Sequence, residues 1–514
     1  MTFGPSPSSE PDGVVRDKKR ILQSPNGASQ SATADRLFRD ALEIVRNHVL
    51  RPERKPAFSL PSAPARKVTP KDGPSEGVDG DLWSIAEALR DGSLTVEGLI
   101  ESARRRIESY DQRLGAFEYV ADVRQEAETL AAEAASSSWR GLLHGIPISV
   151  KDIIDVAGMP TTGSSKALPA RLAHKDSTAV ARLKAAGALI MGKTVTHEFA
   201  LGVTTPQSRN PWDESRVPGG SSGGSAISIV TGMSAASLGT DTRASIRVPA
   251  ALCGLVGFRP TTGLVPIDRW LPLSWSMDVL APMARSVRDV ALLMDVLTDQ
   301  PGGYTGGLPG SLTDLRIAYA NPFSSGTEAG VLSCFESALG GASNDGARVS
   351  EQTGPSDYLL QLSNMTGMVV SRVEAAHAHH EAGTNLAACT PEVRDQLSEA
   401  MLVSGTDYVR CLRIREELYE RFLALFENAD LLLMPTSKVV APPRKEAERY
   451  LLVLSENCIH WSLVGFPAIS LFCGLSDGLP VGVQMVAPPG QDAFLLSAVH
   501  ALERLLPPAP TWSP

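Results

Sequence analysis

Cysteine and positive charge are both scarce in this chain of 514 residues. The six cysteines are widely scattered and never form a CxxC pair, which argues against a zinc site and against a dense disulfide framework. We expect buried, reduced thiols. Lys and Arg number 48 against 57 Asp and Glu, giving a net charge of −9. A nucleic-acid surface needs clustered excess positive charge, so nucleic acid is not an expected partner.

Long apolar runs are also missing. Gly, Ser or charged residues interrupt every apolar stretch well before eighteen residues, and the N-terminus lacks a basic segment followed by an apolar run. These features predict a soluble, cytoplasmic protein with no membrane span. The hydrophobic fraction of 43% and the charged fraction of 20% are ordinary for a globular protein, so disorder of the whole chain is excluded.

Residues 1–80 are predicted to form an N-terminal extension. Residues 1–32 have too few large apolar side chains to offset their ordering entropy, which predicts a disordered tail. Apolar residues then recur with helical spacing over 33–49, and a Pro-rich connector follows over 52–75. The helix is expected to pack on the main body or on a partner.

Residues 81–514 are predicted to form one catalytic domain, because no internal repeat and no clear linker follow residue 80. Two helices joined by a DGS turn open it, the second starting at Thr95. Strand-like segments at 145–150 and 188–193 then alternate with helical segments. This alternation predicts an α/β fold, with chemistry on loops at strand ends.

Three residues on Gly- and Ser-rich segments supply the parts of a hydrolase: Lys151 in GIPISVKD, Ser221 in PGGSSGGSA and Ser245 in GTDTRASIRVPA. A lysine after an apolar strand is usually solvated, but burial would lower its pKa and make it a base. The GGSSGG run alone could be a flexible linker. Its place between an α/β region and an apolar helix favours a loop that approaches a ligand.

Ser245 has two compatible roles, as the N-cap of a helix starting at IRVPAALCG or as a nucleophile. A buried lysine bonded to one serine, itself bonded to a second, would activate that nucleophile without histidine. The backbone N–H groups of Thr242, Arg243, Ala244 and Ser245 are expected to hold an oxyanion.

Segments 141–170 and 187–266 resemble the amidase signature family. The resemblance is carried by the KD, GKT, EFA, GGSSGGS, GTD, SIRVPA and GLVGFRPT motifs and by the spacing of the lysine and the two serines. The later PT near Pro435 and GLPVGVQ near Gly478 are similar to the family's C-terminal pattern, so the likeness spans roughly 81–514.

The resemblance implies an amidase-signature fold, in which helices cover both faces of a mixed, twisted central sheet. It implies that Ser245 is the nucleophile, Ser221 a bridging serine after a non-proline cis peptide, and Lys151 the base. The implied reaction cleaves a carbon–nitrogen amide bond of a small molecule through an acyl-enzyme, chemistry that also serves esters, carbamates and hydrazides. It needs no metal and no organic cofactor. Ser222 and Asp241 are expected to support the site, with turn-stabilising hydrogen bonds as the alternative role.

Arg243 and Ala244 stand where the family has two glycines. The loop is therefore expected to keep a conformation that ordinary residues tolerate. One prediction places Arg243 in solvent or against an acid. The other has its guanidinium line the site entrance and favour a carboxylate or polar carbonyl substrate. Trp270 and Trp275, with the helical segment 358–427, suggest an apolar acyl pocket, and ordinary core packing is the alternative.

The histidines are not predicted to be catalytic. His377, His379 and His380 lie in a helical stretch with no cysteine nearby, so they are expected to be solvated or at the pocket rim rather than to bind metal. His197 is expected to be structural.

Two other functions stay open. The chain could be the amidase subunit of a tRNA-dependent amidotransferase, which would need partner subunits and a tunnel for ammonia. It could also be a catalytically silent family member that serves as a scaffold. The chain could also form a homodimer.

Overall fold

The computed structural model of the chain describes residues 30–50, 78, 80–169, 171–308 and 311–513. The Pro-rich connector and all but the last three residues of the predicted tail lie outside these ranges. Those three residues belong to a helix that begins at Gln30, so the predicted tail is slightly too long.

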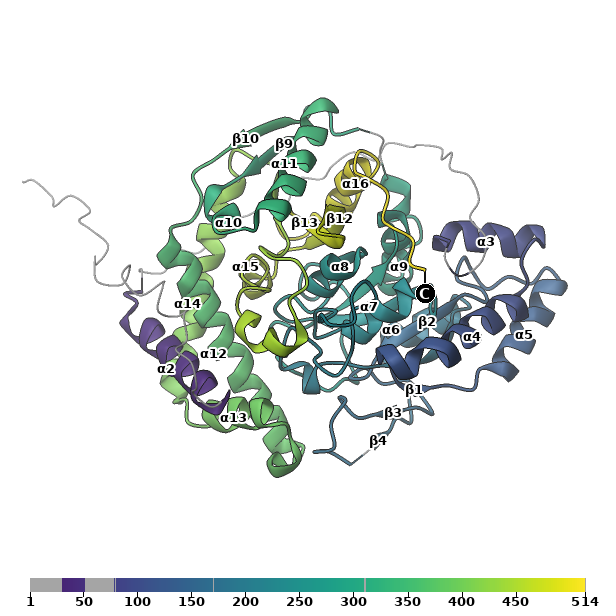
Figure 1. The fold of residues 1–514 in the computed structure, drawn as a ribbon, viewed down its shortest axis with the longest axis horizontal. Coiled ribbons are helices and arrows are strands. Elements are labelled where there is room, and N and C mark those ends of the chain that lie inside the picture. The colour runs from purple at the N-terminus through teal and green to yellow at the C-terminus, as the bar shows by residue number, and fades with distance from the viewer. Residues whose placement is uncertain (1–29, 51–77, 79, 170, 309–310, 514) are drawn as a thin grey trace, which may run out of the picture.

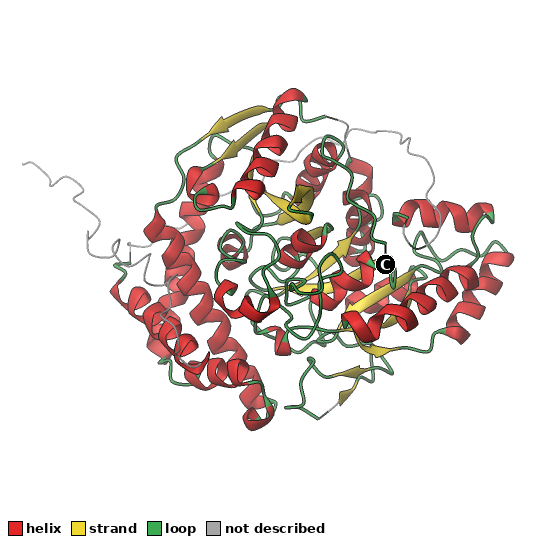
Figure 2. Ribbon diagram, in the orientation of Figure 1, coloured by secondary structure: helices red, strands yellow, loops and turns green. Residues whose placement is uncertain are grey.

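A mixed sheet forms the centre of the described structure (Figure 2). Its eleven strands lie in the order β1-β5-β2-β6-β8-β7-β12-β13-β11-β9-β10. Their bounds are β1 Phe117–Val120, β2 Pro147–Lys151, β5 Leu189–Thr194, β6 Ala236–Asp241, β7 Val256–Arg259, β8 Val279–Ala284, β9 Arg316–Tyr319, β10 Arg348–Glu351, β11 Leu431–Pro435, β12 Ala468–Ser476 and β13 Leu479–Val486. β3 (Pro160–Thr161) and β4 (Arg171–Leu172) form a separate small pair.

Both strand directions occur in the sheet. β2 runs parallel to β5 and β6, and β9 runs parallel to β10 and β11. The β6–β8–β7–β12–β13–β11 pairings between these two groups are antiparallel, as is the pairing of β1 with β5. The predicted mixed sheet is confirmed. Because β2 is flanked by parallel strands, the carboxyl ends of β2, β5 and β6 meet at one edge.

Helices surround the sheet (Figure 1). Their bounds are α2 Gln30–Asn47, α3 Leu82–Asp91, α4 Val96–Leu114, α5 Arg124–Ala135, α6 Thr178–Ala185, α7 Gly223–Val230, α8 Arg247–Cys253, α9 Val287–Thr298, α10 Asn321–Ser324, α11 Ala329–Asn344, α12 Asp357–Glu381, α13 Pro391–Ala400, α14 Gly405–Leu423, α15 Ile459–Val464 and α16 Asp492–Glu503. The 3₁₀ helices are η2 Glu198–Ala200, η3 Thr305–Gly307, η4 Leu386–Ala388, η5 Ala424–Phe426 and η6 Arg444–Tyr450. The expected two-helix lead-in is α3 and α4, and Thr95 caps α4 by accepting a hydrogen bond from the Gly98 amide.

Two glycines in β12 and β13 show that helices cover both faces of the sheet. A side chain at Gly482 would meet Ala251 of α8, whereas one at Gly474 would meet Cys334 of α11. Gly474 pairs with Val481, the neighbour of Gly482. Because successive side chains of a strand point to opposite faces, α8 and α11 lie on opposite sides.

The predicted N-terminal helix is α2. It packs against α12, α13 and α14 at one side of the molecule (Figure 1). Phe38, Ala41 and Val45 are buried in this contact, and Arg46 pairs with Asp407 of α14 at 2.6 Å. Helix α2 therefore packs on the main body, and the division of the chain at residue 80 stays a prediction.

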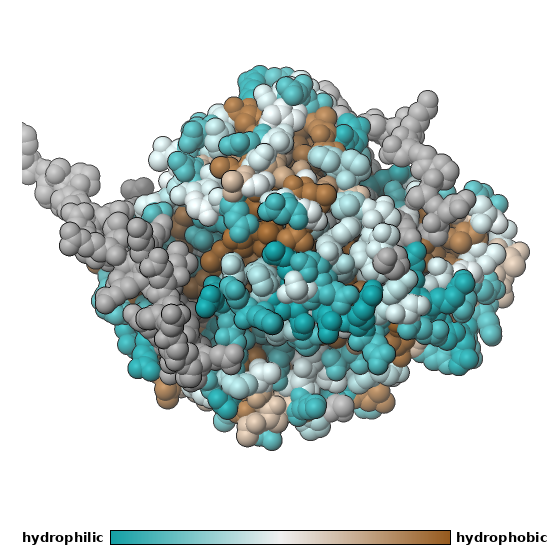
Figure 3. Space-filling view, in the orientation of Figure 1, coloured by the Kyte–Doolittle hydropathy of each residue, from teal (hydrophilic) through white to brown (hydrophobic). Residues whose placement is uncertain are grey.

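The face of the molecule seen in Figure 3 is mixed in character. Figure 3 shows hydrophilic residues interspersed with smaller hydrophobic areas. Across the residues that the structure describes, no helix is both long enough and apolar enough to cross a membrane. All six cysteines are free and five of them are buried; Cys334 is partly exposed, which differs from the prediction that all six would be buried.

Candidate active site

Lys151 is the last residue of β2, at the edge where the parallel strands end. The strand is buried on both sides, and so is the whole lysine side chain. Its Nζ lies 2.7 Å from Ser221 Oγ and 2.9 Å from Thr240 Oγ1. Burial lowers the pKa of Lys151 to about 7, although Asp278 and Asp241 act in the opposite direction. A large fraction of the amine is therefore neutral near physiological pH and can accept a proton.

Ser221 lies in the loop that leads into α7. The Gly220–Ser221 peptide bond is cis, as the family resemblance implied. The Ser221 carbonyl accepts hydrogen bonds from the His197 amide at 3.0 Å and from the Thr205 hydroxyl at 3.2 Å. A side chain at Gly220 would lie 2.7 Å from the Thr204 amide nitrogen, so only glycine fits there. The GGSSGG run is thus a buried, tightly fixed loop and not a flexible linker.

Ser245 lies in the loop between β6 and α8. Its carbonyl accepts a hydrogen bond from the Ser222 amide at 3.2 Å, which places this loop against the one that carries Ser221. Within the described residues, the Ser245 hydroxyl makes no hydrogen bond. It is therefore available to a ligand.

The predicted N-cap role of Ser245 is wrong. Helix α8 begins two residues later, at Arg247, with Ile246 in the cap position. The carboxylate of Asp241, and not the Ser245 hydroxyl, accepts the hydrogen bond of the Ile246 amide at 3.2 Å. An acidic side chain at the N-terminus of a helix satisfies its free N–H groups, and this contact leaves Ser245 unengaged.

The amides of Thr242, Arg243, Ala244 and Ser245 have no acceptor among the described residues. This loop has negative φ angles throughout, so the expectation that ordinary residues tolerate its conformation is confirmed. Free backbone donors beside a serine hydroxyl suit the oxyanion of a tetrahedral intermediate.

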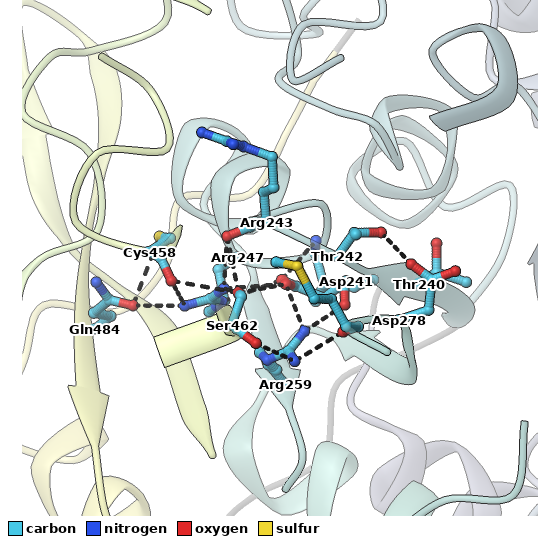
Figure 4. A network of polar contacts seen from close by, with 12 residues as sticks. Thr240, Asp241, Thr242, Arg243, Arg247, Arg259, Asp278, Cys458, Ser462 and Gln484 are labelled. Atoms are coloured by element: carbon cyan, nitrogen blue, oxygen red, sulfur yellow. Dashed lines mark hydrogen bonds and ion pairs between the residues drawn. The ribbon is translucent and has the colours of Figure 1, made fainter. Parts of the chain in front are cut away.

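A buried ionic network fixes the same loop (Figure 4). Asp241 pairs with Arg247 at 3.0 Å and with Arg259 at 3.2 Å, and all three side chains are fully buried. Burial alone would raise the pKa of Asp241, but the two guanidinium groups lower it to about 2. Asp241 is therefore ionised at every working pH.

The network also holds the carbonyl of Arg243. Arg247 Nη2 and Ser462 Oγ each donate to this oxygen at 3.0 Å. In a trans peptide the C=O and the following N–H point in opposite directions, so anchoring the carbonyl directs the Ala244 amide away from the network. This is how Asp241 and its partners orient the loop.

Ser222 contacts the neighbouring segments through both its backbone and its side chain. Besides its amide contact with Ser245, its hydroxyl donates to the Thr240 carbonyl at 3.4 Å. The contact joins the start of α7 to the end of β6.

Arg243 does not lie where the first prediction placed it. It is neither in solvent nor against an acid, because its side chain is buried and donates from Nη2 to Asn364 Oδ1 of α12 at 2.6 Å. In the described part of the chain its Nη1 has no hydrogen-bond partner. Burial and the neighbouring Arg372 lower the pKa of Arg243 to about 9. Figure 4 shows the side chain leading away from the Asp241 network.

The two tryptophans differ in their surroundings. Trp270 Nε1 donates to Asp278 Oδ2 at 3.1 Å, and Asp278 also accepts from the Thr242 hydroxyl at 2.6 Å. Trp270 is thus tied to the loop of Ser245 through one carboxylate. Trp275 is 45% exposed and meets His377 edge to face.

The surroundings of the histidines differ from one to the next. No group of metal-binding side chains occurs among the residues that the structure covers. Of the two predicted positions, solvated or at the pocket rim, the first is wrong for His379, which is buried against Phe199 and bonds to Thr384. His197 packs under the Ser221 loop, near Thr204 and Glu392.

Sequence reasoning missed several residues that shape the site. They are Thr240, Arg247, Arg259, Asp278 and Ser462. The two arginines carried a signal, because each stands as a lone charge within an otherwise apolar segment, SIRVPA and GLVGFRPT. A charge in such a segment indicates a buried ion pair.

Relatives of this chain share most of its length. The A subunit of glutamyl-tRNA(Gln) amidotransferase from Chloroflexus aggregans is 34% identical over 464 residues, which cover 81% of this chain and 94% of the relative. The protein of the same name from Anaeromyxobacter dehalogenans is 35% identical, covering 80% and 93%.

Solved structures match the fold. An amidase crystal structure has a TM-score of 0.75 at 34% identity, covering 83% of this chain and all of that one. A 6-aminohexanoate cyclic dimer hydrolase has a TM-score of 0.74 at 26% identity, with 84% and 97% covered. The A subunit of the Thermotoga maritima glutamyl-tRNA(Gln) amidotransferase has a TM-score of 0.69 at 28% identity, with 82% and 98% covered.

The sequence profile of one family, described as Amidase, matches residues 98–496, which include Lys151, both loop serines and the Asp241 network. Because this profile matches most of the chain and relatives above 30% identity cover about four fifths of it, the protein belongs to the amidase family. It also has the mixed α/β fold of that family.

Proposed function

We propose that this chain hydrolyses carboxylic amides with Ser245 as nucleophile, Ser221 as proton relay and Lys151 as base. The observation that carries the proposal is the 2.7 Å contact between Lys151 Nζ and Ser221 Oγ, made by a fully buried lysine whose pKa is about 7. At neutral pH a lysine with this lowered pKa can accept a proton, whereas an exposed lysine is already protonated.

In the first step Ser245 Oγ attacks the carbonyl carbon. Its proton moves to Ser221 Oγ while the Ser221 proton moves to Lys151 Nζ. The carbonyl oxygen becomes an oxyanion, which the free amides of the Thr242–Ser245 loop stabilise. The C–N bond then breaks, and the proton on Lys151 returns through Ser221 to the leaving nitrogen.

The acyl group is left as an ester on Ser245. Water attacks it, giving its proton to the same relay, and the ester C–O bond breaks to release the carboxylic acid. Ser245 then regains a proton from the relay. The proposed steps draw only on side chains and backbone amides of this chain, so the mechanism calls for no metal and no organic cofactor.

The most direct test is a panel of amides, carbamates and aryl esters assayed with the wild type and with Ser245→Ala. We expect amide turnover in the wild type and its loss in the variant. Ser228→Ala is the matched control, because Ser228 is a buried α7 serine that bonds to Ser149 and Ser234 and not to Lys151. Turnover that survives Ser245→Ala would contradict the mechanism.

Two settings for this chemistry have support. The two sequence relatives described above are both named as A subunits of glutamyl-tRNA(Gln) amidotransferase, at 34% and 35% identity, and this favours the amidotransferase setting over a free-standing small-molecule amidase. In that setting the amide donor would be hydrolysed here and its ammonia passed to a partner subunit. The amidase and cyclic dimer hydrolase structures, which match as fully, support the free-standing setting.

Purification decides between them. A tagged chain recovered from its own cells would carry partner subunits and convert glutamyl-tRNA in the amidotransferase setting. A chain that purifies without partner subunits and hydrolyses small amides as fast as any partner-bound preparation would contradict that setting. The silent-scaffold alternative fails if either preparation hydrolyses an amide in a Ser245-dependent way.

A further inference from the structure

Arg243 is a buried cation without a counter-ion among the described residues. The other two fully enclosed arginines of the region, Arg247 and Arg259, both pair with Asp241. Arg243 bonds to the neutral Asn364, and the charge that acts on it is the like charge of Arg372. An unpaired buried charge is strongly unfavourable, so such a group calls for an anion.

The guanidinium also has an unused donor. Nη1 of Arg243 is shielded from water and lacks a partner within the described structure. Nearby on α15, His460 bonds to Ser363 through Nδ1, while its Nε2 likewise lacks a partner there. Burial, Lys438 and Arg243 lower the pKa of His460 to about 3, so it is neutral and leaves the positive charge to Arg243. Buried donors left unpaired are rare in native proteins and call for an explanation, of which a bound ligand is one.

Arg243 stands close to the reacting serine. It lies two residues before Ser245, and two residues span at most about 7 Å of chain. Its backbone is fixed by Arg247 and Ser462, while its side chain leaves the loop toward α12, away from the Asp241 network (Figure 4). Arg243 and Ser245 are therefore held in one short, fixed loop.

We propose that Arg243, held by Asn364, binds a carboxylate on the substrate, so that the preferred substrates are short amides carrying an anionic group. The Nη1–H donor and the positive charge would both be satisfied by that carboxylate. This inference rests on the proposed hydrolysis at Ser245 and adds the charge of the substrate. It fits both settings, since glutamine and the half-amides of short dicarboxylic acids belong to this class.

The test uses a matched pair of substrates, succinamate and succinamide, which differ only in whether the distal group is a carboxylate or a neutral amide. The measured quantity is the ratio of kcat/KM for succinamate to kcat/KM for succinamide. We expect a ratio well above one in the wild type and a fall of about 10- to 100-fold in Arg243→Met, the range for losing a hydrogen bond to a charged group. Arg243→Lys should keep part of the preference.

Arg372→Gln is the matched control. Arg372 is an arginine of α12 whose charge also acts in this region, but its guanidinium donates to Gln396 and Ser371 and lies near Glu392. Its removal should change the ratio far less than Arg243→Met does. An equal change in both variants would mean that general positive potential, and not a contact of Arg243, sets the preference, and this would overturn the inference.

The outcomes separate the two proposals. If the wild type hydrolyses neither amide and Ser245→Ala changes nothing, the proposed hydrolysis fails. If both are hydrolysed in a Ser245-dependent way and the ratio is near one, or is unchanged in Arg243→Met, only the Arg243 inference fails. If Arg243→Met does not fold, the kinetic comparison is replaced by calorimetry, which measures the affinity of Ser245→Ala for succinamate and for succinamide. Equal affinity for the two compounds would overturn the inference.

Discussion

Lys151 gives the mechanism a defined pH dependence. The relay works only when the amine is neutral, and its pKa is lowered to about 7 by burial. About 1% of the lysine is neutral at pH 5 and about 90% at pH 8, because the neutral fraction changes about tenfold per pH unit below the pKa. We therefore expect kcat/KM to rise about 90-fold between these values and then to level off.

The assay is ammonia release from a neutral amide such as succinamide, measured from pH 5 to 9 so that only the enzyme titrates. Thermal melts at each pH serve as the control for unfolding. The negative charge of Asp278 opposes the effect of burial and raises the pKa of Lys151, so Asp278→Asn should move the midpoint to lower pH. A flat profile, or a rate that falls as pH rises through 7, would refute the role of Lys151 as base.

Two further substitutions test the scaffold of the site. Asp241→Asn leaves Arg247 and Arg259 as buried charges without a carboxylate, and we expect a loss of about 3–5 kcal/mol in unfolding free energy, measured by denaturant or thermal melts. Asp122→Asn, which breaks an exposed pair with Arg124, is its control and should move the melting midpoint little; equal effects would contradict the network's role. Gly220→Ala places a methyl group 2.7 Å from the Thr204 amide, so we expect at least a tenfold loss of kcat/KM, whereas Gly340→Ala meets nothing within 4 Å and should leave activity intact. Full activity in Gly220→Ala would show that the Ser221 loop is not held as described.

The sheet and the strand-end lysine were predictable because their signals are local. The apolar segments over 145–150 and 188–193 correspond to β2 and β5, and the bounds of the two strands differ from the predicted ones by at most two residues. Glycine-rich sequence around Ser221 marked a close backbone approach, which the crowding at Gly220 explains.

The remaining parts of the site depend on contacts between distant segments. Thr240 reaches Lys151 only because β6 lies beside β2, and Ser462 reaches the Arg243 carbonyl from α15, more than two hundred residues away. The N-cap prediction for Ser245 failed because Asp241 competes for the same helix terminus through the loop's fold. The side chain of Arg243 could not be placed from sequence, since the position of α12 decides its surroundings.

The central claim is that Ser245 is the nucleophile, and covalent labelling tests it most directly. Trypsin cleaves after Arg243 and after Arg247, so Ser245 is recovered in the short peptide 244–247, where it is the only hydroxyl, while Ser221 falls in the peptide 217–243. After reaction with a fluorophosphonate, mass spectrometry should find the added mass on 244–247 in the wild type and not in Lys151→Met. Added mass on 217–243 instead, or an unlabelled 244–247 in an enzyme that hydrolyses amides, would contradict the account.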